Sequence, residues 1–419
     1  MFEKYSLKNK MNVLLVPQRD TQAATFLVMY PVGSRYESES LRGASHYIEH
    51  LMFKGTQKRK NTLTLTREID RLGAEYNAFT GKEYTAYYIK TDTKYSRIAL
   101  DILSDMLNNS KFDAREMERE KPVIVEELNM YKDNPVMSIE NNFEELIFAG
   151  SRLGNDIGGT PKHVMNYKRD EVLSYHKKYY QPQNATLVIA GKIDDKTRAW
   201  VDEFFGAYKN SGKVSSAFTP AQFASIEKNK RIVVEEKSTD QSQLMLGFPA
   251  FPRGDERNYA VAVMNTILGG SMSSRLFIKV RERLGLAYMV RSSDEYFHDV
   301  GYACVRAGLD AKNINKAIAT IQKEIEKLVK KGVTVRELKD AKTHIHGGIT
   351  LSLEDSSTQA NWYAREAVLS KTIHTPEEIL AKVEAVTAAD IQRVAKQIFD
   401  WKKVRIAIIG NIKKEKVVF

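Results

Sequence analysis

The sequence Gly43-Ala-Ser-His-Tyr-Ile-Glu-His-Leu-Met-Phe-Lys-Gly-Thr56 contains the most informative pattern of the chain, formed by His46, Glu49 and His50. On a helix, positions i, i+3 and i+4 lie on one face, so two imidazoles and a carboxylate point into the same small volume. This combination binds a zinc ion and places a base beside it. The order H-x-x-E-H is the inverse of the H-E-x-x-H zinc signature.

A third ligand is needed, because a catalytic zinc site takes three protein ligands and leaves one position open. The segment 118–130 offers Glu120 and Glu127, which are seven residues apart and therefore lie on one helical face. Glu126 is the neighbouring alternative, but it points roughly 100° away around the helix. We predict Glu127 as the ligand and Glu120 as a carboxylate that orients a ligand imidazole through its other nitrogen.

Three segments, in their order and spacing, resemble the pitrilysin family, which includes insulin-degrading enzyme and the mitochondrial processing peptidase. They are GASHYIEHLMFKGT, LGAEYNAFTGKEYTAYY and EREKPVIVEELNMYKDNP. The resemblance runs over nearly the whole chain and matches the half-size bacterial type. It implies a zinc endopeptidase that binds one Zn²⁺ per chain through His46, His50 and Glu127, with Glu49 as the general base.

The composition is that of a globular protein without a membrane anchor. The chain has 419 residues, 42% of them hydrophobic, which suggests two or three domains with packed cores. No apolar run approaches the roughly 18 residues of a membrane span, and the first residues lack the apolar core of a signal peptide. Because Cys304 is the single cysteine, no intrachain disulfide forms, and we expect a cytoplasmic protein.

The net charge of +11 raises the alternative of nucleic-acid binding. The lysines, however, are spread among helical segments instead of gathered into arginine-rich runs, and no nucleic-acid module is recognisable. We therefore expect neither a nucleic acid nor a membrane as partner. The charge is more simply explained by solvated helix faces, with some attraction for acidic peptides.

The chain is predicted to be a tandem duplication. Lys8-Asn-Lys10 precedes an apolar run, and the same pattern recurs at Lys228-Asn-Lys230. The later strand and glycine patterns of the two halves correspond as well. We predict a metal-binding domain at 1–210, a linker at 211–225 with glycine, proline and serine, and a homologous domain at 226–419.

Each half mixes strand and helix patterns. In the first half we expect a buried strand at Ala23–Val32, the metal helix at Leu41–Lys54, and a hairpin of Ala74–Thr80 with Glu83–Lys90. The second half repeats this order. The predicted fold class is α+β, with two homologous tandem domains that each contain a mainly antiparallel sheet covered by helices on one side.

The second half lacks the metal pattern. The position that corresponds to His46 falls within 263–269, where no His or Glu occurs, so only the first half is expected to hold the metal. The second half instead contains Arg281 and Tyr288, seven residues apart around a Leu-Gly turn. The family resemblance implies that this pair helps to bind the substrate and to stabilise the reacting carbonyl.

The expected substrate is a short or unfolded polypeptide. Glu49 is predicted to accept a proton from the attacking water and to pass it to the leaving amine. The peptide is expected to add as a strand to the sheet edge at Asn77, Ala78 and Phe79, because strand addition binds backbone without requiring a sequence. Asn77 resembles the backbone-binding asparagine of the family.

The resemblance also bears on assembly. Large family members hold four such units that close around a chamber, and this chain is one half. We expect a homodimer with composite sites, in which each zinc faces Arg281 and Tyr288 of the partner subunit. The alternative is a non-catalytic structural subunit of a processing-peptidase-like complex. Such subunits usually lack a ligand or the base, and all four residues are present here.

Overall fold

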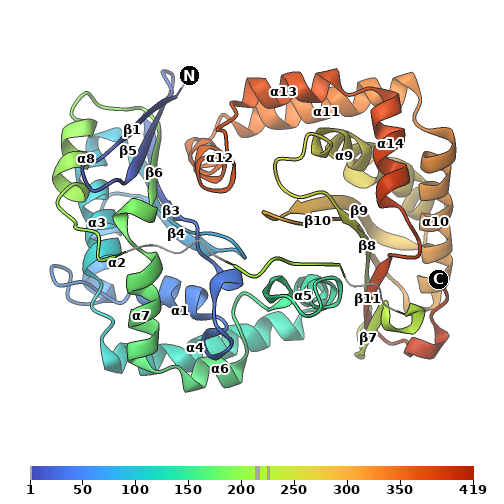
Figure 1. Cartoon of the computed structure of the whole chain (residues 1–419), viewed down its shortest axis with the longest axis horizontal. Coiled ribbons are helices and arrows are strands. Elements are labelled where there is room, and N and C mark those ends of the chain that lie inside the picture. Colours follow the sequence, from blue (N-terminus) through green and yellow to red (C-terminus); the bar gives the residue numbers. More distant parts are fainter. Residues whose placement is uncertain (1, 213–217, 224–226) are drawn as a thin grey trace. The chain divides into compact units, whose positions relative to one another are not determined.

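The computed structural model describes residues 2–212, 218–223 and 227–419, which form two compact units. Figure 1 traces the chain through both of them. The first unit comprises Met1–Leu128, Asn155–Phe218 and Ser352–Thr375. The second unit comprises Asn129–Gly154, Thr219–Leu351 and Pro376–Phe419. Within the described ranges, every helix is too short or too polar to cross a bilayer.

The first unit contains a six-stranded sheet in the order β1-β2-β6-β3-β5-β4. Its strands are β1 (Glu3–Ser6), β2 (Asn12–Pro17), β3 (Ala23–Tyr30), β4 (Glu75–Thr80), β5 (Thr85–Asp92) and β6 (Thr186–Gly191). All neighbouring strands are antiparallel except β2 and β6, which are parallel. The strand β4 that carries the predicted substrate residues is therefore at an edge of the sheet.

Helices cover both faces of this sheet. Side chains of a strand alternate between the two faces, and both faces of β3 carry apolar side chains that need cover. Phe26 and Val28 of β3 belong to the large core cluster, whereas Leu27 and Met29 pack on α12 (Ser356–Leu369). The large cluster is shared with α1 (Ala44–Leu51), α2 (Thr62–Asp70), α3 (Ser96–Asn109), α4 (Ala114–Asp133), α6 (Pro161–Asn166), α7 (Arg169–Tyr179) and α8 (Thr197–Phe205).

The second unit repeats this plan with a five-stranded sheet in the order β7-β11-β8-β10-β9. Its strands are β7 (Ile232–Glu236), β8 (Ser242–Ala250), β9 (Ala287–Tyr296), β10 (Gly301–Leu309) and β11 (Arg405–Gly410). Among the described strands of this second sheet, only the β7–β11 pair is parallel. One face packs on α9 (Asn258–Asn265), α10 (Ile314–Lys331), α11 (Val335–Ser352), α13 (Pro376–Ala385) and α14 (Ala388–Ile398), and the other on α5 (Pro135–Ile147).

The predicted α+β class with two mainly antiparallel, helix-covered sheets is confirmed, but the expectation of helices on one side of each sheet is wrong. The second face of each sheet is covered by one helix from the other half of the sequence. The helix α5 precedes residue 210 yet packs on the second sheet, and α12 follows residue 226 yet packs on the first (Figure 1). A strand buried on both faces needs such a helix, and a pattern read locally cannot say which half supplies it.

The compact units therefore do not follow a single cut in the chain, and the domains at 1–210 and 226–419 remain a prediction about sequence units. The predicted linker at 211–225 falls partly on residues 213–217 and 224–225, which lie outside the described residues. Two of its described residues make specific contacts. Phe218 lies under the guanidinium of Arg35 in the first unit, and the N–H of Ala221 donates to Asp299 in the second.

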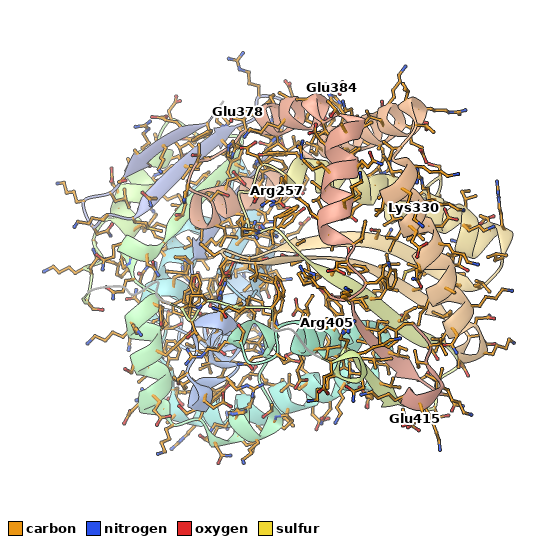
Figure 2. All side chains as sticks on the ribbon, turned by 45° about the vertical axis from the view of Figure 1, so that its right-hand side comes forward. Arg257, Lys330, Glu378, Glu384, Arg405 and Glu415 are labelled. Atoms are coloured by element: carbon orange, nitrogen blue, oxygen red, sulfur yellow. The ribbon has the colours of Figure 1, made fainter. Side chains whose placement is uncertain are left out.

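Basic side chains of the second unit stand beside acidic partners. Arg257 bonds Asp255 at 2.7 Å, and Lys330 on α10 lies 3.6 Å from Glu326 (Figure 2). Arg405, at the start of β11, is instead buried and donates to the backbone oxygen of Lys403 at 2.9 Å. The charges of Arg257 and Lys330 are thus balanced by carboxylates close in sequence.

Candidate metal centre

Two helices, α1 and α4, bring three ligand-type side chains together in the first unit. His46 and His50 are one turn apart on α1, and their ring centroids are 4.7 Å apart. Glu127 on α4 places Oε2 at 3.7 Å from His46 Nε2 and at 3.3 Å from His50 Nε2. The ligand atoms of all three lie within 4.8 Å of one another. This is the one such cluster within the parts of the chain that the structure describes.

The packing of α4 decides which glutamate faces the histidines. Met117, Glu120, Ile124 and Leu128 are buried at helical spacing, so this face of α4 is turned to the core. Glu127 lies at the margin of that face and reaches α1. The alternative ligand Glu126 is exposed, as the angle between successive helical residues predicts.

Glu120 lies where a carboxylate orients a ligand imidazole. Its Oε1 is 2.9 Å from His50 Nδ1, and its Oε2 pairs with Lys54. Burial disfavours the charged imidazole of His50, but the bonds to Glu120 and Glu127 outweigh it and raise the pKa of His50 to about 9. The His50 imidazole is therefore protonated near pH 7. Binding of a metal ion by this imidazole would release the extra proton.

His46 has a different environment from His50. Burial, together with the nearby charge of His50, lowers the pKa of His46 to about 4, although Glu127 opposes this effect. Its imidazole is therefore neutral near pH 7, which is the form that binds a metal. Its Nδ1 is buried, with no hydrogen-bond partner among the described residues.

Glu49 lies close to His50 and Glu127 but is not part of the ligand cluster. Thr80, the last residue of β4, donates from its hydroxyl to Glu49 Oε2 at 2.5 Å. Burial raises the pKa of the Glu49 carboxyl, while the bond from Thr80 and the proximity of His50 oppose the rise. A carboxylate whose pKa is raised in this way is a stronger base than one in water.

The predicted substrate residues lie on the open edge of the first sheet. The strand β4 pairs with β5 and with no other described strand. Asn77 is exposed, and its side-chain oxygen accepts from the N–H of Ala78 at 2.8 Å. Phe79 is half-buried against Tyr84. The edge runs to Thr80, which contacts Glu49, so a strand bound here would approach the Glu49 carboxylate.

Arg281 and Tyr288 meet in the second unit. The Arg281 guanidinium carbon lies 5.3 Å from the ring centroid of Tyr288 and 4.7 Å from that of Phe277. Tyr288, near the start of β9, is 73% exposed, so its hydroxyl is available to a ligand. The structure brings this predicted pair together within its own unit.

Sequence reasoning missed two residues of the centre. Lys54 lies four residues after His50, just past the end of α1 at Leu51, and this closeness in sequence was a usable signal for its place beside Glu120. Thr80 carries no such signal, because its contact with Glu49 depends on how the hairpin packs against α1. Both residues bond a carboxylate that the sequence did identify.

The residues present fit zinc. Two imidazole nitrogens and one carboxylate oxygen form the His₂Glu donor set of catalytic zinc sites, which keep a further position open. The bond between Glu120 and His50 Nδ1 supplies the outer contact that ligand histidines usually make.

Comparisons with known proteins found family models and relatives that together match most of the chain. A family model described as "Insulinase (Peptidase family M16)" matches residues 12–161, and one described as "Peptidase M16 inactive domain" matches residues 166–345. YmxG of Bacillus subtilis, named an uncharacterized zinc protease, is 33% identical over 414 residues, covering 98% of this chain and 100% of the relative. An uncharacterized zinc protease of Streptomyces coelicolor is 33% identical over 397 residues, covering 94% of this chain and 86% of the relative.

Solved structures show the same fold. The crystal structure of a protease from Helicobacter pylori has a TM-score of 0.91 at 22% identity, covering 98% of this chain and 99% of that one. A peptidase M16 inactive domain from Pseudomonas fluorescens has a TM-score of 0.89 at 18% identity, covering 98% of both chains. With relatives that match along almost its whole length, the chain belongs to the M16 (pitrilysin-like) family of peptidases, half-size type.

Proposed function

We propose that the chain is a zinc-dependent endopeptidase that hydrolyses short or unfolded polypeptides, with one zinc ion per chain. The observation that carries the proposal is the convergence of His46, His50 and Glu127 beside the carboxylate of Glu49. When bound, zinc supplies a Lewis acid that polarises a peptide carbonyl and makes water more acidic. Zinc proteases among the relatives support the choice of metal.

The chain's own residues have distinct parts in this proposal. His46, His50 and Glu127 hold the ion, and Glu120 fixes the ring of His50. Glu49 accepts the proton of the attacking water and later gives it to the leaving nitrogen. Thr80 keeps the Glu49 carboxylate directed by its hydrogen bond.

The substrate would bind as a strand on β4. The N–H of Gly81 donates to the backbone oxygen of Tyr84. The backbone N–H and C=O groups of the odd-numbered residues of β4 therefore point toward β5. The N–H and C=O groups of Ala78 and its alternate neighbours then face the open edge. The bond from the Ala78 N–H to the Asn77 side chain agrees with this direction, and a bound peptide would compete for that donor. An extended peptide is required, which supports unfolded substrates.

The alternative, a non-catalytic structural subunit, has one observation in its favour, which is the match to the inactive-domain model. That match covers residues 166–345, whereas His46, Glu49, His50 and Glu127 all lie within 12–161, the match to the insulinase model. The complete set of ligands and base favours the catalytic proposal.

Metal removal tests the proposed activity. We expect the purified chain to cleave an unstructured, internally quenched peptide, to lose this activity on treatment with a chelator, and to regain it with stoichiometric zinc. A folded protein that binds zinc at the centre but cleaves no member of a random peptide library would instead support the structural subunit.

We also propose that the protein forms a homodimer, in which Arg281 and Tyr288 of each subunit complete the zinc site of the other. We propose a cytoplasmic location, because the single cysteine, Cys304, is buried and free, as expected in a reducing compartment. The Arg281–Tyr288 contact supports a joint role for this pair. Mixing inactive Glu49→Gln chains with inactive Arg281→Ala chains is expected to restore part of the activity, because mixed dimers contain one intact site. If no mixing ratio restores activity, the result counts against zinc sites shared between subunits.

A further inference from the structure

The first turn of α1 is held by a side chain from outside the helix. The first N–H groups of any helix lack partners within it. Here Glu37 supplies two acceptors, because its Oε2 accepts from the N–H of Gly43 at 2.6 Å and its Oε1 from the N–H of Ser45 at 2.7 Å. The N-cap residue Gly43 provides no side-chain bond. The carboxylate of Glu37 thus ties down the start of the metal helix.

The surroundings of Gly43 explain why the cap comes from elsewhere. Gly43 has φ +92°, a conformation that side chains disfavour, and a Cβ there would lie 2.3 Å from the backbone oxygen of Gly158. The usual Ser, Thr, Asp or Asn cap therefore does not fit at this position. The chain instead buries a whole carboxylate, since Glu37 is 1% exposed. Burial raises the pKa of Glu37 to about 7 despite the two backbone bonds.

The two histidines depend on this turn to different degrees. His46 is the third residue of α1 and belongs to its first turn, and its Nδ1 has no partner among the residues described. His50 lies in the second turn, where Glu120 orients its ring through Nδ1. Among the described residues, no hydrogen bond at Nδ1 orients the ring of His46, whereas Glu120 orients that of His50 through Nδ1.

We propose that Glu37 is the positioning residue of His46, and that its two backbone bonds place the Nε2 of His46 toward Glu127. The inference rests on the proposed zinc site. In this inference Glu37 orients His46 indirectly, through the helix backbone, whereas Glu120 orients His50 through a direct hydrogen bond. Loss of this support acts on metal binding before it acts on the chemical step.

The test is the zinc affinity of the full chain, measured by competition with a chromophoric chelator. A Glu37→Gln variant presents a donor to one of the two N–H groups, so the first turn must shift. We expect its zinc affinity to fall about 10- to 100-fold, the range seen when an outer partner of a ligand is lost. The absorption bands of the cobalt-substituted protein should change with it. If Glu37→Gln does not fold, Glu37→Asp, which keeps the charge on a shorter side chain, is expected to show the same direction.

Two comparisons separate positioning from general stability. Glu144→Gln removes another buried carboxylate, from α5 in the second unit, and we expect it to leave zinc affinity unchanged. In a His46→Ala background, Glu37→Gln should not weaken the residual zinc binding further, because the histidine it positions is gone. An equal loss in both backgrounds, or wild-type affinity in Glu37→Gln, would overturn the inference while the zinc site stands. A wild-type chain that binds no zinc would overturn the proposed function as well.

Discussion

A zinc-loaded Glu49→Gln variant is expected to bind zinc as tightly as the parent chain and to hydrolyse peptides about 10²- to 10⁴-fold more slowly. Glutamine keeps the size of the side chain and an oxygen for the hydroxyl of Thr80. It cannot accept the proton of the attacking water. The loss should appear in kcat, with little change in KM, because the strand edge that binds the peptide is unaltered.

The measurement is steady-state hydrolysis of a quenched peptide, with the zinc content of each preparation determined in parallel. Glu126→Gln, an exposed neighbour of the ligand Glu127, provides the matched control and should behave like the parent. Full activity of a zinc-loaded Glu49→Gln variant would show that Glu49 is not the base.

A Glu127→Gln variant is expected to lose zinc binding by more than about 100-fold, the upper end of the losses caused by removing outer partners of a ligand. Glu127 Oε2 approaches both His46 Nε2 and His50 Nε2, so it is the atom that closes the ligand set. An amide oxygen carries no net charge and is a weaker ligand for a divalent cation. Activity should be lost at low zinc and recover in part when zinc is raised.

Zinc titration by calorimetry checks this prediction, with Glu120→Gln as a graded comparison. Because Glu120 contacts His50 and not the ion, its loss should weaken zinc binding by about 10- to 100-fold. Equal affinity in Glu127→Gln and the parent chain would remove Glu127 from the ligand set and leave Glu126 or another carboxylate to be tested.

Much of the centre could be predicted from the sequence, because its residues occupy one helical face each. The spacing of His46, Glu49 and His50 and that of Glu120 and Glu127 follow from the period of the α-helix. The structure brings these five residues together as that spacing implies.

The supporting contacts could not be predicted in the same way. Glu37 caps a helix whose N-cap is glycine, so the usual cap signal is absent from the sequence. The contact of Thr80 with Glu49 depends on the packing of the hairpin on α1. The bounds of the metal helix were not predicted correctly either. It was predicted at Leu41–Lys54 but is found at Ala44–Leu51, because Gly43 adopts a positive φ and cannot be part of a helix.

The packing of a helix from one half of the sequence on the sheet of the other half could not be predicted from a local pattern either. The continuous apolar run at residues 26–29 shows that both faces of β3 are buried. It does not show that the cover of one face comes from Ser356–Leu369, more than three hundred residues later. Long-range partners of this kind are settled by the burial of the whole sheet and not by any single segment.

The location of zinc in crystals grown with the metal tests the central claim most directly. Anomalous scattering at the zinc absorption edge should give one strong peak in the first unit, in contact with the Nε2 atoms of His46 and His50 and with the carboxylate of Glu127. No peak among these three side chains, with Glu127 turned away from the histidines, would contradict the assignment of the metal centre and the peptidase activity derived from it.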